Sequence, residues 1–299
     1  MTRNVSLFGV SPATRIRKGR VITKESLAET LLQIEEKLNA GRSGEAEKLI
    51  IHTLGNFSNS FETQAKLNRF LSFALETQGR YAPSLKVLKP FEPEDILRRL
   101  KPATYISVLV QLAIAYSNLD VSAKALKLLN AALEYAEANR LPEFYVEIYV
   151  ALARVYRKLN EFPIARDNAE KGLKYFREAG DWRGMAESYH LIAQSLQDML
   201  ERQGFDTFSF ARSEDAAVMG ANAQNIDLIT ADVRLLPGDG MKAVEQICAK
   251  REIPVVFITA YAEELQDRDP NAVVIQKPIK EEELGALVRK MVTNRPQHP

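Results

Sequence analysis

Three short apolar runs in the last third of the chain each end in one polar residue. The runs are IDLITAD, IPVVFIT and AVVIQK, and their last residues are Asp232, Thr259 and Lys277. Continuous runs of Val, Ile and Leu are typical of strands buried on both faces of a parallel sheet, and open sheets of this kind bind ligands beyond the carboxyl ends of their strands. We therefore expect these three side chains to meet at one edge of a sheet.

The three side chains form a set suited to handling a phosphoryl group. A carboxylate can act as the nucleophile, a hydroxyl can donate to a phosphoryl oxygen, and an ammonium can neutralise the charge of the group. The alternative for Asp232 taken alone is an ordinary strand-end carboxylate that caps the following loop. Without phosphate, Lys277 would pair with Asp232 in a salt bridge.

The same stretch resembles the receiver domain of two-component response regulators. An Asp-Gly pair follows Asp232 by seven and eight residues, and a proline follows Lys277 directly, as in the family's pattern. This resemblance implies a flavodoxin-like parallel sheet with Asp232 as the phosphoacceptor for a partner histidine kinase. It also implies that Thr259 is the switch hydroxyl and that Lys277 binds the phosphate.

Features around the second apolar run look closest to the FATGUY-type receivers, the class that includes the general-stress-response regulators. They are Pro254, the run FITAY at 257–261, and a short helix expected over 262–267. Val274 stands where many receivers carry a switch aromatic. We therefore expect Tyr261 to take over that role.

The start of the domain departs from the receiver pattern. Receivers open with a strand that ends in two acidic residues, which bind Mg²⁺, and counting back from Asp232 places Glu187 and Ser188 there. The preceding DWRGMA is not an apolar strand. We therefore expect the first strand to be missing and any Mg²⁺ site to be weakened, with Asp232 as a ligand and Glu187 as the one further candidate.

Loss of a strand should leave an open sheet edge or a strand-sized gap. Either a helix over about 183–202 covers the gap, or the domain is distorted or pairs with another chain, so dimerisation stays open. Beyond this point the family's order predicts the first receiver helix to 202, a second strand over 205–211 and a second helix over 213–223.

Helix-type periodicity repeats at about 40 residues through the first two thirds of the chain. Each unit is predicted to be a helix, a tight turn and a second helix that begins near a small residue. The helix-ending residues are Gly41, Gly79, Asp120 and Asn160, and the small residues are Ala46, Ser84, Ala125 and Ala165.

This pattern resembles the tetratricopeptide repeat over roughly 25–200. Such repeats stack into a superhelix because one helix pair cannot bury its apolar face alone. The resemblance implies a concave groove that binds peptides or helices of partner proteins. No catalytic constellation is visible in the repeats.

The domain organisation predicted from these patterns combines α and α/β parts. We expect an N-terminal arm over 1–24, tetratricopeptide-like repeats over 25–187, a receiver-like domain over 188–294 and a tail over 295–299, with the helix at about 183–202 shared. The fold class is thus an α-α superhelix followed by a truncated flavodoxin-like parallel-sheet domain.

Composition limits the partners and the compartment. The net charge of +1 gives no general reason to expect nucleic acid, and no apolar run reaches the ~18 residues of a membrane span. The single cysteine, Cys248, excludes an internal disulfide and fits a reducing compartment. We expect a cytoplasmic protein with no membrane partner.

We interpret the chain as a signalling or scaffold protein that binds partner proteins through its repeats, with Asp232 as the phosphoacceptor. The alternatives are a pseudo-receiver scaffold that works without phosphorylation, a chimeric fusion whose halves share no function, and, less favoured, a phosphatase acting on a response regulator. Beyond self-phosphorylation of Asp232 we expect no enzyme activity.

Overall fold

The structure, a computed structural model, describes residues 24–56, 60–223, 225–235, 238–249 and 251–293. All of the predicted N-terminal arm except Lys24, and the whole of the predicted tail, lie outside these residues. The chain divides into two compact units, one ending at Leu119 and the other beginning at Asp120. The second unit therefore combines the last helices of the repeat region with the sheet.

Antiparallel helical hairpins build the first unit, as the repeat predicts. Its buried cluster includes Ile34, Ile50 and Leu67, so the helices α1, α2 and α3 share one apolar core. The helices are α1 (Lys24–Asn39), α2 (Ser43–Asn56), α3 (Phe61–Glu76), α4 (Tyr81–Leu88), α5 (Glu94–Leu97) and α6 (Pro102–Asn118), with the 3₁₀ turn η1 (Lys89–Phe91).

The four helix-ending residues predicted from the repeat all have the left-handed backbone conformation. Gly41 and Gly79 each have φ of 72°, and Asp120 and Asn160 have φ of 62° and 63°. Glycine takes this conformation without a Cβ clash, and Asn and Asp tolerate it better than other side chains. This part of the repeat prediction is confirmed.

The small residues predicted early in the second helices are all fully buried, namely Ala46, Ser84, Ala125 and Ala165 at 0% exposure. A small side chain lets two helices approach closely. At Ser84 the hydroxyl also forms a hydrogen bond of 2.8 Å with Ser72 Oγ, which satisfies both buried hydroxyls.

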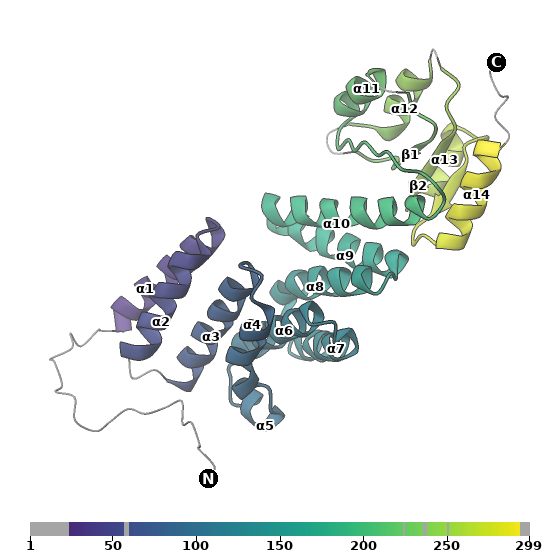
Figure 1. Cartoon of the computed structure of the whole chain (residues 1–299). Helices are drawn as coiled ribbons and strands as arrows, with labels where there is room; N and C mark the ends of the chain where they lie inside the picture. Colours follow the sequence, from purple (N-terminus) through teal and green to yellow (C-terminus); the bar gives the residue numbers. More distant parts are fainter. Residues whose placement is uncertain (1–23, 57–59, 224, 236–237, 250, 294–299) are drawn as a thin grey trace, which may run out of the picture. The chain divides into compact units, whose positions relative to one another are not determined.

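The second unit begins with four helices. In Figure 1, α8, α9 and α10 lie side by side. Val150, Ala169 and Leu191, one from each helix, pack in one buried cluster. The helices are α7 (Ser122–Ala138), α8 (Tyr145–Lys158), α9 (Phe162–Ala179) and α10 (Trp182–Glu201), with the 3₁₀ turn η2 (Pro142–Phe144).

A parallel sheet follows, with the strand order β1-β2-β3 among the described residues. Ile229 pairs with Val255, and Phe257 pairs with Val274, which fixes the register of the sheet. The strands are β1 (Ile229–Ala231), β2 (Val255–Thr259) and β3 (Val274–Gln276), and the helices are α11 (Glu214–Asn222), α12 (Gly240–Cys248), α13 (Ala262–Arg268) and α14 (Glu281–Thr293).

The predicted strand over 205–211 is wrong, because the structure gives these residues no regular secondary structure. A strand exists only through ladder hydrogen bonds to a neighbour, and β1 pairs only with β2 among the described residues. The helix expected at about 183–202 is present as α10, and the helices expected over 213–223 and 262–267 are present as α11 and α13.

The helix α10 belongs to the repeat stack and to the core of the sheet domain. Met199 and Leu200 at its end pack with Val256 and Ile258 of β2, and Phe162 of α9 joins the same cluster. A second cluster on the other side of the sheet contains Phe257 and Leu265 among its members. The sheet is therefore covered on one face by helices of the repeat stack together with α14.

No helix in the described parts of the chain is long and apolar enough to cross a membrane. The most apolar helix, α6, carries the buried Gln111, whose side-chain amide donates to Glu76 at 2.8 Å. Its apolar surface is thus used for packing inside the first unit.

Candidate functional site

The parallel strands bring Asp232, Thr259 and Lys277 to one edge of the sheet, as the sequence predicts. Lys277 Nζ donates to Asp232 Oδ2 at 2.9 Å. The backbone N–H of Lys277 donates to the carbonyl of Thr259 at 3.0 Å, which ties the ends of β2 and β3 together. A carboxylate, a hydroxyl and an ammonium therefore lie at the carboxyl ends of adjacent strands.

The three side chains differ in their access to solvent. Asp232 is 33% exposed and Lys277 is 19% exposed, so a reagent can reach the carboxylate. Thr259 is fully buried, and its hydroxyl accepts the backbone N–H of Tyr261 at 3.1 Å. A hydroxyl that accepts this bond can still donate its own proton to a second group.

The loop after β1 is held close to Asp232 by the Asp-Gly pair. Asp239 caps α12 by accepting the N–H groups of Met241 and Lys242, at 2.8 and 3.2 Å. A Cβ on Gly240 would lie 1.8 Å from the carbonyl oxygen of Asp232. Only glycine fits there, because α12 begins against the backbone of the candidate phosphoacceptor.

Asp239 has its own ion pair with Arg268, at 2.9 Å. Burial alone would raise the pKa of the Asp239 carboxyl, but the hydrogen bond from Arg268 and those from the N–H groups of Lys242 and Met241 together lower the pKa below its ordinary value. The carboxylate form therefore stabilises the start of α12.

Tyr261, the candidate switch aromatic, is 43% exposed. The guanidinium of Arg234 lies 3.7 Å from the centre of its ring. Arg234 also pairs with Glu264 at 2.9 Å, so the tyrosine is covered by a residue from the loop beside Asp232. This contact links the aromatic ring to the candidate phosphoacceptor loop.

A fourth charged side chain in the site comes from the repeat stack. Glu170 of α9 accepts from Lys277 Nζ at 3.0 Å. The same carboxylate oxygen accepts from Arg166 Nε at 3.0 Å, and the Arg166 side chain is only 7% exposed. Lys277 is therefore bridged between two carboxylates, one from the sheet and one from α9.

Sequence reasoning missed Glu170. The only local signal was the Arg166 and Glu170 pair at helical i, i+4 spacing, which is common on helix surfaces and gives no direction toward a distant strand. The approach of α9 to the end of β3 depends on packing around Phe162, which sequence periodicity does not place.

Glu187, the further candidate for a metal carboxylate, has a different partner in the structure. The α10 helix directs Glu187 toward α8, where it forms an ion pair with Arg154. It also lines a separate cavity of about 270 Å³ with Arg157 and His190. Ser188, the neighbouring candidate position, is fully buried, and a Cβ on Gly172 of α9 would lie 3.6 Å from its hydroxyl oxygen.

The described residues do not fit a receiver-type magnesium site. Among them, no group of three or more His, Cys, Asp or Glu side chains is placed to hold a metal ion. The two carboxylates that do meet, Asp232 and Glu170, are already bridged by the Lys277 ammonium. Both Asp232 and Glu170 would have to leave Lys277 before they could bind a cation together.

A cluster of tyrosines on α8 and α9 is a candidate surface for a partner protein. Tyr149 and Tyr175 stack with ring centres 6.1 Å apart, and Tyr145 lies edge-on to Tyr175 at 5.3 Å. All three side chains are half-buried. Tyrosine is enriched in protein interfaces because a large apolar ring ends in a polar group.

In a comparison with known proteins, the later part of the chain matches a protein family. The family described as response regulator receiver domain matches residues 185–289. The phyllosphere-induced regulator PhyR of Methylorubrum extorquens is 33% identical over 106 residues, which cover 34% of this chain and 40% of that protein. The transcriptional regulatory protein PdtaR of Mycobacterium tuberculosis is 33% identical over 79 residues, or 26% of this chain and 38% of that protein.

The chain spans about two fifths of the length of these curated relatives. Among solved structures, the apo form of the quorum sensor NprR from B. thuringiensis has a TM-score of 0.45 and 15% identity, covering 67% of this chain and 58% of that one. The receiver match begins inside α10, so this helix lies in both the repeat stack and the matched domain.

Proposed function

We propose that this chain is a signalling protein whose repeats bind partner proteins and whose receiver-like domain accepts a phosphoryl group at Asp232. The observation that carries the proposal is the contact of Lys277 with Asp232 at 2.9 Å, beside the buried Thr259. The similarity to named regulators supports the same assignment.

The chemistry follows from these three side chains. An Asp232 carboxylate oxygen forms a bond to phosphorus while the bond from phosphorus to the donor breaks, and the donor leaves with that electron pair. With a phosphohistidine donor of a partner kinase, the leaving atom is an imidazole nitrogen. The Lys277 ammonium and the Thr259 hydroxyl then meet the phosphoryl oxygens.

We further propose that the receiver-like domain is of the FATGUY type and lacks its first strand. The run from Phe257 to Tyr261 and the short helix α13 support the type. The continuous helix α10 supports the loss, since it occupies the residues at which the receiver match begins. Tyr261 would report the phosphorylation state through its contact with Arg234.

A second candidate function is a pseudo-receiver that binds partners without phosphorylation. Lys277 is already bridged between Asp232 and Glu170, and this contact favours a site that is closed by an ion pair. The absence of a three-carboxylate group among the described residues favours it as well.

Phosphorylation of the whole chain separates these two functions. The chain is incubated with acetyl phosphate, with Mg²⁺ or with EDTA, and phosphoryl groups are counted by intact mass. The phosphoacceptor proposal expects one group that Asp232→Asn removes and that Asp267→Asn, an exposed control on α13, retains. An unlabelled chain that still binds its partners when Asp232 is Asn supports the pseudo-receiver.

A further inference from the structure

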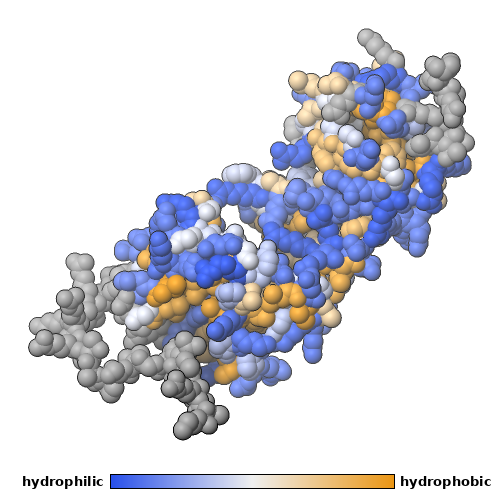
Figure 2. Space-filling view, viewed as in Figure 1, coloured by the Kyte–Doolittle hydropathy of each residue, from blue (hydrophilic) through white to orange (hydrophobic). Residues whose placement is uncertain are grey.

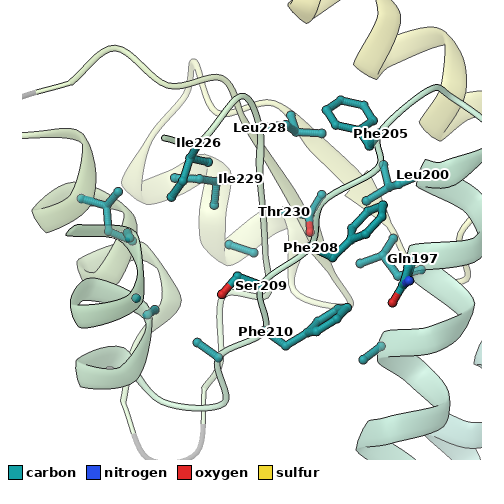
Figure 3. A pocket seen from close by; sticks show the side chains of 18 of the residues that line it. Gln197, Leu200, Phe205, Phe208, Ser209, Phe210, Ile226, Leu228, Ile229 and Thr230 are labelled. Carbon is teal, nitrogen blue, oxygen red and sulfur yellow. The ribbon is translucent and has the colours of Figure 1, made fainter. Parts of the chain in front are cut away.

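A cavity of about 510 Å³ lies beside β1 in the receiver-like domain. Two stretches of consecutive residues form its facing walls, 205–211 and 225–231, and Figure 3 shows side chains from both around the space. When every residue of an extended stretch lines a cavity, the backbone itself faces that cavity. The cavity therefore lies between two lengths of extended backbone.

On the β1 wall, the backbone of Thr230 faces the cavity. Ile229 donates its N–H to the carbonyl of Pro254 at 2.9 Å and therefore faces β2. In a parallel strand the backbone groups of alternate residues point to opposite edges, so the N–H and C=O of Thr230 point away from β2. Thr230 is one of the residues that line the cavity.

The opposite wall is unpaired. Within the described parts of the chain, no backbone hydrogen bond involves the residues 206–211. The Thr207 hydroxyl donates to the side chain of Asp206 at 3.1 Å, which leaves the backbone groups of both residues unused. Backbone N–H and C=O groups in native proteins are almost always paired, so the backbone groups of Thr230 and of residues 206–211, which face each other across the cavity, indicate a space for a third length of backbone.

The two broad faces of the cavity are apolar. Ile192 and Leu196 of α10 form one face, and Val244 and Ile247 of α12 help to form the other. In Figure 3, Phe208 and Phe210 extend from the 205–211 wall toward α10. Phe210 is 56% exposed, and Figure 2 shows apolar side chains gathered over the region of α11, α12 and β1.

We propose that this cavity binds an extended apolar segment of a partner protein, which adds to the sheet as a strand parallel to β1. A strand has backbone donors and acceptors along both of its edges, so it can bond to the backbone on both walls of the cavity. Val and Ile side chains on its two sides would pack against the two apolar faces. Strand addition of this kind obtains affinity from main-chain hydrogen bonds and specificity from side-chain pockets.

One charge in the lining adds to the chemistry of the occupant. Arg166 lines the cavity, and its Nη1 atom is buried without a hydrogen-bond partner among the described residues. A buried guanidinium nitrogen without a partner is costly, so an acceptor is expected on the bound segment. The occupant is therefore an apolar strand with a carboxylate near one end.

Other occupants leave the walls unsatisfied. An α-helix satisfies its own backbone, so it would leave Thr230 and the 206–211 wall unpaired. An apolar small molecule would fill the space without donors or acceptors for the walls. A strand is the occupant that matches both the faces and the walls.

The test is a titration of the full chain with a fluorescent synthetic peptide that has a Val-Ile-Val-Val-Ile core followed by Glu, read by fluorescence polarisation. Saturable binding is expected. The same peptide methylated on alternate backbone nitrogens keeps its side chains but loses ladder donors, and it is expected to bind about tenfold more weakly or worse.

Variants locate the binding site. Ala193→Phe and Ala217→Phe fill the cavity from opposite faces and should abolish peptide binding, whereas Ala223→Phe, an exposed residue outside the lining, should not. Circular dichroism shows that each variant is folded. Asp232→Asn should leave binding unchanged, so this inference and the phosphoacceptor proposal stand or fall separately.

Three results would overturn the inference. They are no saturable binding, equal binding of the N-methylated peptide, and equal binding by the filled variants. A fourth result would do the same: a dimer, seen by light scattering, that the peptide does not dissociate but that Ala193→Phe does, because the occupant of the cavity would then be a second copy of the chain.

Discussion

At the scale of single residues, Lys277 decides what the site can do. Its ammonium contacts Asp232 at 2.9 Å and Glu170 at 3.0 Å, so an incoming phosphoryl group must compete with Glu170 for the same cation. Glu170 is itself held by the buried Arg166, which makes its carboxylate a fixed competitor. Phosphorylation at Asp232 would thus change the contact between Lys277 and Glu170 of α9.

Glu170→Gln should speed the labelling of Asp232. Glutamine can still accept from Arg166 but carries no charge, so Lys277 becomes more available to phosphoryl oxygens. The initial rate with acetyl phosphate is expected to rise about threefold to tenfold, equivalent to removing roughly 1 kcal/mol of competition. The rate is measured by intact mass over time.

The matched control is Glu178→Gln, an exposed residue on the same helix, and it should leave the rate unchanged. Equal rates for Glu170→Gln and the wild-type chain would show that Glu170 does not compete for Lys277. Both variants remove one negative charge from α9. A difference between their rates therefore reports the contact of Glu170 with Lys277 and not the change in net charge.

Gly240→Ala should destabilise the receiver-like domain by about 2 kcal/mol or more, because the new Cβ cannot occupy a point 1.8 Å from the Asp232 carbonyl. The control is Gly220→Ala in α11, where a Cβ would meet nothing closer than Ser209 Oγ at 4.0 Å. Removing glycine from a helix there should stabilise by about 0.5 to 1 kcal/mol. Urea unfolding gives both values, and a neutral Gly240→Ala would contradict the close approach.

At the scale of elements, the sequence was informative where pattern and environment agree. Three apolar runs became the three strands, and the spacing of the Asp-Gly pair placed Gly240 against Asp232. These features depend on local residue types and on burial on both faces, which a sequence displays directly.

Sequence reasoning was less informative for segments whose structure depends on contacts with other parts of the chain. Residues 205–211 have the apolar pattern of a strand. A strand also needs hydrogen bonds to a neighbouring strand, and the residue pattern could not show that this neighbour is missing. Glu187 was assigned by counting residues along a family pattern, whereas the rotation of α10 directs it to Arg154. Glu170 reached the site through tertiary packing, which leaves no mark in residue spacing.

The start of α12 should respond to acid through Asp239. Its pKa is lowered in the folded chain, so the carboxylate contributes stability that is present above the ordinary pKa of 3.8 and is lost as pH falls through the lower folded value. Asp239→Asn keeps the capping oxygen but removes the charge. At pH 6 this substitution should lower the free energy of unfolding by roughly 0.5 to 1 kcal/mol. The loss is small because the ion pair with Arg268 is partly exposed to solvent.

The cost of Asp239→Asn should shrink as the pH is lowered toward 3, because the wild-type carboxylate then becomes protonated. Urea unfolding of both chains at several pH values measures this difference. A cost that stays constant with pH would mean that the ion pair with Arg268 and the helix terminus do not depend on the charge of Asp239.

At the scale of the whole molecule, the second compact unit joins helices of the repeat region to the sheet. The compact unit begins at Asp120, so α7 to α10 group with the sheet. The reason is visible in the core, where Phe162, Met199 and Ile258 pack together although they come from α9, α10 and β2. The sequence predicted that a helix at about 183–202 is shared, and α10 occupies these residues, but repeat periodicity did not show that α9 joins the same core.

Because α10 supplies side chains to the core of the sheet, the helices α9 and α10 and the sheet should unfold as one cooperative body. Met199→Ala removes a fully buried side chain from that core and should cost about 2 to 5 kcal/mol. Met219→Ala, 74% exposed on α11, is the control and should stay within about 0.5 kcal/mol.

Hydrogen exchange in increasing urea, read by mass spectrometry, tests the cooperativity of this body. Peptides from α9, α10 and β2 should lose protection at the same urea concentration in the wild-type chain, and Met199→Ala should lower that concentration for all three together. If β2 exchanges while α9 and α10 keep their protection, the receiver-like domain unfolds independently. The contact between Glu170 and Lys277 could then not carry a signal from Asp232 into the repeats, because no common fold would connect them.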